Sequence, residues 1–146
     1  MTEEKFDFTI ESLGPCTIQS PIKLSTAHGD YTANYVRDDS FVINNINVYD
    51  LTKPVVLDSS NLMEKAGPRE FIYFNPKHVN AGICTCGGLC PGLNDVIRAV
   101  VRCLYNRYGV RRIRGIRFGF KGLFPENQFD TIDLTPDIVD DIHKTG

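Results

Sequence analysis

The chain has 146 residues, of which 42% are hydrophobic and 23% are charged, and its formal net charge is −2. A length of this order suits one domain or part of one, and the apolar fraction excludes wholesale disorder. The small net charge excludes a general attraction to nucleic acid or to a membrane surface, and no apolar run approaches the roughly 20 residues of a membrane helix.

Residues 1–66 are predicted to form an irregular N-terminal extension of short strands and loops. Turn-forming pairs such as Gly14-Pro15 recur in the first 35 residues. Clusters of β-branched residues predict strands at residues 41–46 and 54–57. Residues 61–65 fit a single turn of helix.

From residue 79 the sequence predicts a strand, a glycine-rich loop, a helix and a second strand. The first strand is VNAGICTC (79–86), the loop is GGLCPGLN (87–94), and the helix is NDVIRAVVRCLYNRY (94–108). Asn94 suits the N-cap of this helix, and Gly109 suits the position that follows its last turn. The second strand is RRIRGIRFG (111–119). A strand–helix–strand unit predicts a parallel pair of strands with a right-handed crossover.

The apolar residues of this helix are predicted to form one buried stripe. They are Val96, Ile97, Val100, Val101 and Leu104. Arg98 and Arg102 lie off the stripe.

Residues 119–127, GFKGLFPEN, are predicted to form a loop, and a second helix is predicted from Thr135 through Ile142. Thr135 would cap this helix, and Pro136 suits its first position. One strand–helix–strand unit leaves a sheet with too few strands to bury both faces. We therefore expect a piece of a larger α/β domain.

Gly87 and Gly88 form a candidate anion site, because they lie between a strand and the N-terminus of a helix. The first N–H groups of a helix lack internal partners, and the helix dipole adds positive charge there. Glycine removes the Cβ that would keep a phosphate away. The spacing fits neither GxxxxGK[ST] nor GxGxxG. A tight turn needs glycine with or without a ligand, so a purely structural loop stays open as an alternative.

The chain has five cysteines, an odd number. Its first residues, MTEEKFDF, and those that follow show the pattern of neither a signal peptide nor a transit peptide. We therefore expect a cytoplasmic protein with reduced thiols. Cys84, Cys86 and Cys90 raise the alternative of a metal site. Structural zinc needs four ligands, and no fourth lies nearby, so we expect these side chains to pack and no metal to bind this chain.

Between Val96 and Pro125 the chain carries basic residues and no acid. The basic residues are Arg98, Arg102, Arg107, Arg111, Arg112, Arg114, Arg117 and Lys121. This zone indicates an anionic ligand or an acidic neighbouring surface, and a solvated face with salt bridges between subunits is the alternative. Nucleic-acid binding is not expected, since no nucleic-acid motif accompanies the arginines.

The run AGICTCGGLCPGLNDVIRAVV (81–101) resembles the first strand, loop and helix of the phosphofructokinases. Within this run, LCPGLNDVIR resembles the form that the same segment takes in the ATP-dependent branch of plants, protists and some bacteria. AGPREFIYFNPKHV (66–79) and GIRFGFKGLF (115–124) resemble the segments before and after. The resemblance implies the N-terminal part of the α/β phosphofructokinase fold, with residues 67–146 as the start of its nucleotide-binding domain.

The family transfers the γ-phosphoryl of ATP to the 1-hydroxyl of fructose 6-phosphate, with Mg²⁺, in a cytoplasmic homo-oligomer of glycolysis. The resemblance implies that Gly88 lets the nucleotide phosphates approach the backbone and that Gly87 supports the turn. It places Phe120 beside the adenine. Arg98 and Arg102 match arginines that face an effector phosphate between subunits in bacterial relatives, and pairing between subunits is the alternative.

The family's Mg²⁺-binding Gly-Gly-Asp segment and the Thr-Ile-Asp-type segment with the general base do not occur in residues 1–146. We therefore expect an N-terminal fragment that holds no catalytic residue and no Mg²⁺ ligand and is inactive alone. A pyrophosphate-dependent phosphofructokinase is one alternative. An unrelated nucleotide-binding module and a non-catalytic truncated paralogue that binds partners are the others.

Overall fold

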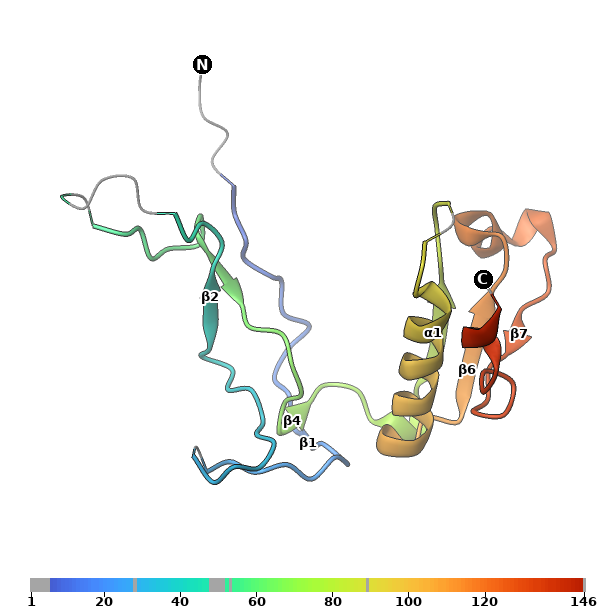
Figure 1. The fold of residues 1–146 in the computed structure, drawn as a ribbon, viewed down its shortest axis with the longest axis horizontal. Coiled ribbons are helices and arrows are strands. Elements are labelled where there is room, and N and C mark those ends of the chain that lie inside the picture. Colours follow the sequence, from blue (N-terminus) through green and yellow to red (C-terminus); the bar gives the residue numbers. More distant parts are fainter. Residues whose placement is uncertain (1–5, 28, 48–51, 53, 89, 146) are drawn as a thin grey trace, which may run out of the picture. The chain divides into compact units, whose positions relative to one another are not determined.

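The computed structural model describes residues 6–27, 29–47, 52, 54–88 and 90–145 (Figure 1). The chain divides into two compact units, Met1–Tyr73 and Phe74–Gly146. The predicted domain boundary between residues 66 and 67 stays a prediction.

The first unit contains two small antiparallel ladders. Strand β1 (Ile18–Gln19) pairs with β4 (Phe71–Ile72), and β2 (Phe41–Ile43) pairs with β3 (Leu62–Glu64). The predicted strand at residues 41–46 therefore exists in a shorter form. The predicted helical turn at residues 61–65 is wrong, because these residues pair with β2. A single isolated helical turn has too few internal hydrogen bonds to compete with such a ladder.

The predicted strand at residues 54–57 is also wrong. These residues have no ladder partner among the described parts of the chain, and Val56 is 54% exposed. The Val56 carbonyl accepts a hydrogen bond from the Asn61 side chain at 2.9 Å instead. β-Branched residues favour a strand only where a neighbouring strand supplies packing.

The second unit contains a mixed three-stranded sheet in the order β5-β6-β7. Strands β5 (Asn80–Cys84) and β6 (Arg112–Ile116) are parallel, which confirms the predicted parallel pair. Strand β7 (Ile132–Asp133) adds to β6 in the antiparallel sense and was not predicted. Its two residues are too few to give a sequence signal.

Helix α1 (Leu93–Arg102) connects β5 to β6 and continues as a π-helical segment, Cys103–Tyr108. Gly92 is its N-cap, with a φ of 83°, so the prediction of Asn94 as N-cap is wrong. The helix begins earlier because glycine adopts this left-handed conformation without strain. The Asn94 side chain donates to the Thr145 carbonyl at 2.6 Å. Gly109 ends the helical segment in the left-handed conformation, as predicted.

The core of the second unit lies between α1, the sheet and the turn after β7. Its buried side chains are Val101, Val110, Ile113 and Val139. Three of the five residues in the predicted stripe pack in the core: Val101 is buried, with Ile97 and Leu104 partly buried beside it. Val96 and Val100 are exposed. The three-stranded sheet is too small to cover all the apolar residues of the stripe.

The predicted helix from Thr135 through Ile142 does not form. Turns follow Thr135 instead, and a short 3₁₀ helix, η5, spans Ile142–Lys144. Thr135 caps one turn, because its hydroxyl accepts from the Ile138 N–H at 3.4 Å. The turns carry Val139 into the core, where it is 1% exposed. The predicted loop at residues 119–127 contains two 3₁₀ helices, η3 (Gly119–Leu123) and η4 (Pro125–Asn127).

Val101→Ala should lower the free energy of unfolding by about 2 kcal/mol, because it removes two buried carbons from a position that is fully enclosed. Val96→Ala, on the exposed side of the same helix, is the matched control and should stay within about 0.5 kcal/mol of the wild-type chain. Urea unfolding followed by circular dichroism measures both. Equal losses for the two variants would contradict the assigned orientation of α1.

Candidate functional site

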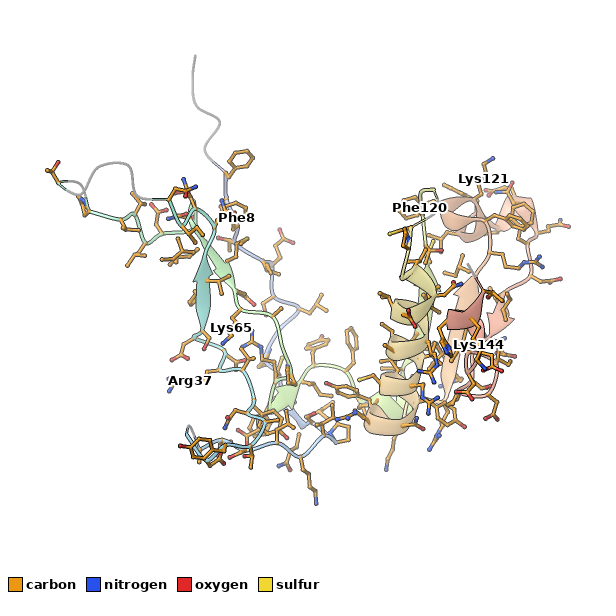
Figure 2. The ribbon with its side chains drawn as sticks, in the orientation of Figure 1. Phe8, Arg37, Lys65, Phe120, Lys121 and Lys144 are labelled. Carbon is orange, nitrogen blue, oxygen red and sulfur yellow. The ribbon has the colours of Figure 1, made fainter. Side chains whose placement is uncertain are left out.

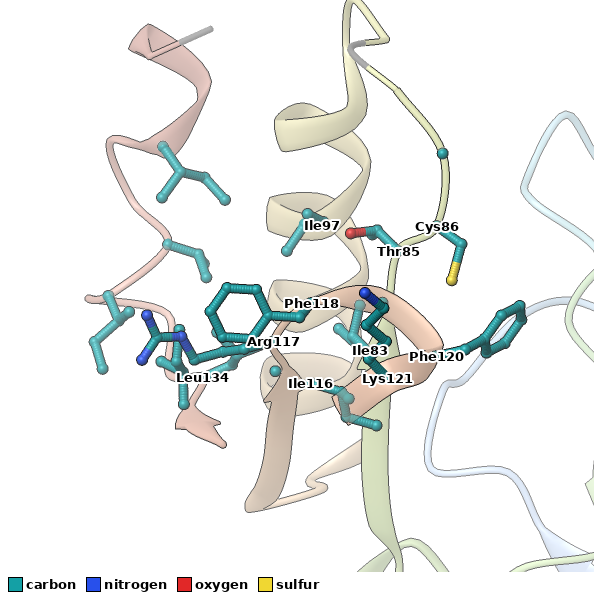
Figure 3. Close-up of a pocket in the computed structure, with 17 residues that line it drawn as sticks. Ile83, Thr85, Cys86, Ile97, Ile116, Arg117, Phe118, Phe120, Lys121 and Leu134 are labelled. Carbon is teal, nitrogen blue, oxygen red and sulfur yellow. The ribbon is translucent and has the colours of Figure 1, made fainter. Parts of the chain in front are cut away.

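A pocket of about 810 Å³ opens where β5 and β6 end (Figure 3). Thr85, Cys86 and Gly87 line it directly after β5, and residues 117–121 line it directly after β6. The two strands are parallel, so their carboxyl ends meet at one edge of the sheet. In open α/β sheets this edge is where ligands bind.

The glycine loop supplies one side of this pocket. Gly87 has a φ of 116°, and a Cβ added at Gly87 or at Gly88 would meet no described atom within 4 Å. Gly87 lines the pocket, whereas Gly88 lines a neighbouring hollow of about 490 Å³ beside the start of α1. The structure therefore brings Gly87 and Phe120 to one pocket and places Gly88 next to it.

The turn after β6 supplies the opposite side, and two of its glycines lie close to neighbouring atoms. A Cβ at Gly122 would lie 2.1 Å from the Arg117 carbonyl oxygen. A Cβ at Gly119 would lie 3.2 Å from the Cys86 sulfur. The turn is thus packed tightly against the loop after β5. Phe120 and Lys121 project from it (Figure 2), and the Phe120 ring is 67% exposed.

The side chains around the pocket give it an apolar floor and a positive rim. Ile83, Ile97 and Leu134 contribute to the floor. Arg117 and Lys121 contribute two cations, and the described lining residues include no Asp or Glu. Both cations belong to the basic zone between Val96 and Pro125, but the sequence did not place them at a ligand site. Lys121 could have been identified as a candidate site residue because it directly follows Phe120 in the sequence.

Arg98 and Arg102 lie away from the pocket and bind Asp140 of the same chain. The Arg98 Nε donates to the Asp140 backbone carbonyl at 2.9 Å, and its guanidinium lies 3.1 Å from the carboxylate. Arg102 lies 2.6 Å from the same carboxylate oxygen. The hydrogen bond from Arg98 and the charges of both arginines lower the pKa of Asp140. An effector or interface role for the two arginines stays a prediction.

The cysteines form no metal site among the residues that the structure describes. All five are free thiols. The sulfurs of Cys84 and Cys86 are 3.8 Å apart, and burial together with the neighbouring Cys86 raises the pKa of the Cys84 thiol. Within the described chain, no helix has the length and apolar character that a membrane crossing requires.

Residues 80–146 match the family model described as Phosphofructokinase. The chain is 46% identical over 143 residues to the ATP-dependent 6-phosphofructokinase of Borreliella burgdorferi, covering 98% of this chain and 31% of that protein.

Two further relatives carry the same name. The protein of Amycolatopsis methanolica is 42% identical over 149 residues, covering 100% of this chain and 32% of that protein. The protein of Entamoeba histolytica is 54% identical over 87 residues, covering 60% of this chain and 20% of that protein. The chain therefore spans about a third of the length of the first two relatives.

The pKa of Asp140 should lie below the ordinary aspartate value and should return toward it in Arg98→Gln. A carboxyl with a lowered folded-state pKa contributes stability above its unfolded-state pKa, and that contribution is lost as the pH falls through the folded-state pKa. Carbon-detected NMR titration of the side chain measures the shift. Arg107→Gln, which changes an arginine that does not contact Asp140, is the control. An unchanged Asp140 titration in Arg98→Gln would show that the pair does not persist in solution.

Proposed function

The chain belongs to the phosphofructokinase family, and we propose that it supplies the nucleotide-binding part of an ATP-dependent 6-phosphofructokinase. The reaction transfers the γ-phosphoryl of ATP to the 1-hydroxyl of fructose 6-phosphate and yields fructose 1,6-bisphosphate for glycolysis. The named relatives from two bacteria and a protist, all ATP-dependent 6-phosphofructokinases, support this proposal.

The observation that carries the proposal is the pocket at the carboxyl ends of β5 and β6. Its volume of about 810 Å³ falls within the range of small-molecule sites, roughly 300–1,000 Å³. It combines an apolar floor, an exposed aromatic ring at Phe120 and a cationic rim without described carboxylates. A ligand with an apolar base and an anionic phosphate tail suits both the apolar, aromatic part of the pocket and its cationic rim.

Gly87 and Gly88 would face the phosphates. The space beside their missing Cβ atoms is open, so a phosphate oxygen can approach the backbone there. The hollow beside Gly88 also contains the first residues of α1, Asn94 and Asp95. The opening N–H groups of a helix lack internal partners and carry partial positive charge.

Phe120 favours ATP over pyrophosphate as the phosphoryl donor. Pyrophosphate has no apolar part, so neither the exposed ring nor the floor around Ile83 and Leu134 would contribute to its binding. A purine can stack on the ring and gain the aromatic and apolar contact.

Mg²⁺ would neutralise charge on the transferred phosphoryl group. Among the residues that the structure describes, the pocket lining has no carboxylate and the hollow beside Gly88 has one, Asp95, and no cluster of three or more His, Cys, Asp or Glu side chains could hold the ion. We therefore propose that the Mg²⁺ ligands and the general base lie outside residues 1–146. The active protein would be a cytoplasmic homo-oligomer, as in the family.

The complete open reading frame that encodes residues 1–146 should yield an enzyme that phosphorylates fructose 6-phosphate with ATP and not with pyrophosphate. An aldolase-coupled assay of the purified product, run with each donor in turn, measures this. The polypeptide of residues 1–146 alone is the control and should show no turnover. Turnover with pyrophosphate would reverse the donor assignment. A product without turnover on either donor would favour a non-catalytic nucleotide-binding or interaction protein.

A further inference from the structure

Lys121 lies on the 3₁₀ helix η3, directly after Phe120, and lines the pocket together with Thr85, Cys86 and Gly87. Figure 3 shows its amine on the side of Thr85 and Cys86, whereas the Phe120 ring extends in another direction. The turn lies close to the loop after β5, since a Cβ added at Gly119 would be 3.2 Å from the Cys86 sulfur and from the Thr85 carbonyl oxygen. The Lys121 stem therefore begins close to the candidate phosphate site.

The charge of Lys121 has no acidic partner among the residues that the structure describes. Other cations of the same unit do form ion pairs with carboxylates: Arg98 and Arg102 with Asp140, Arg114 with Asp133, and Lys144 with Asp141. The other cation of the pocket, Arg117, lies over the Phe118 ring at 5.2 Å. Lys121 is thus the pocket cation with neither an acid nor a ring against it.

Consecutive residues of a 3₁₀ helix point about 120° apart, because three residues complete one turn. Phe120 and Lys121 therefore present an aromatic face and an ammonium group in two directions from one short rigid element. A nucleotide carries a base and phosphates that are held apart by its sugar. We propose that Lys121 is a specificity-determining residue that binds a phosphate of the nucleotide while Phe120 contacts the base.

This inference rests on the proposed nucleotide-binding function and adds a residue to it. An ammonium on a flexible stem binds phosphate as a point charge, and a pocket without carboxylates leaves that attraction uncompensated. Adenosine would engage Phe120 alone, and pyrophosphate would engage Lys121 alone. Only a nucleotide would engage both, so the pair would select ATP over either part of it.

The backbone around Lys121 is fixed by contacts that do not involve its side chain. The Asn127 side-chain amide donates to the Lys121 carbonyl at 2.8 Å. Gly122 lies against the Arg117 carbonyl with no room for a Cβ. A substitution of the Lys121 side chain therefore leaves the turn in place, and its effect on binding can be assigned to the lost ammonium group.

The test is a titration of the isotope-labelled chain with ATP and, separately, with adenosine, followed through the amide NMR signals of Gly87 and Phe120. Lys121→Gln should weaken ATP binding about tenfold, the size expected for one charge-assisted hydrogen bond, and leave adenosine binding unchanged. Lys121→Arg should stay close to the wild-type chain. Lys77→Gln, an exposed lysine of the same unit that does not line the pocket, is the matched control.

Equal ATP affinities for Lys121→Gln and the wild-type chain would overturn this inference and leave the proposed function intact. Equal losses for ATP and adenosine would also overturn it, since they would indicate a disturbed pocket. A wild-type chain that responds to neither ligand would overturn the proposed nucleotide site together with the role of Lys121.

Discussion

The parallel pairing of β5 with β6 is the constraint on which the rest of the second unit depends. It brings the ends of both strands to one edge of the sheet, so that the glycine loop and the turn after β6 face each other across one pocket. Parallel strands need a crossover, which α1 provides. The buried contact of Val101 with the core keeps that crossover on the sheet and so holds the loop at its position.

The glycines around the pocket divide into two physical classes. Gly122, Gly119 and Gly87 are explained by the chain itself: a Cβ at Gly122 would collide with the Arg117 carbonyl oxygen, and Gly119 and Gly87 have left-handed φ values of 60° and 116°. Gly88 has neither a close contact with a described atom nor a φ in the left-handed region, so neither constraint explains why it lacks a Cβ. The structure thus separates the glycines that the chain's own geometry explains from Gly88, a distinction that sequence alone could not make.

Sequence predicts the parts of this fold whose signals are local. The strand, the glycine loop, the helix and its end at Gly109 follow from apolar periodicity and glycine placement, and the resemblance rests on the same segment. The missed parts depend on distant partners. Residues 62–64 become a strand because they pair with β2, and the turns after Thr135 replace a helix because Val139 enters the core.

The candidate site was predictable in part for the same reason. Gly87 and Phe120 were identified from the loop and the resemblance, and the structure brings both to one pocket. The binding of Arg98 and Arg102 to Asp140 joins residues about forty positions apart and leaves no pattern in the sequence. The cationic rim could be counted in the sequence, but its position relative to the pocket depends on how the turn after β6 folds.

The position of the adenine relative to Phe120 tests most directly whether the pocket at the ends of β5 and β6 is a nucleotide site. We would record intermolecular NOEs between the adenine ring protons of ATP and the isotope-labelled chain. NOEs to the Phe120 ring and to side chains of the pocket floor, such as Ile83, are expected. If saturating ATP gave no NOEs, or gave NOEs only to residues outside the pocket, the assignment of this pocket as a nucleotide site would be contradicted.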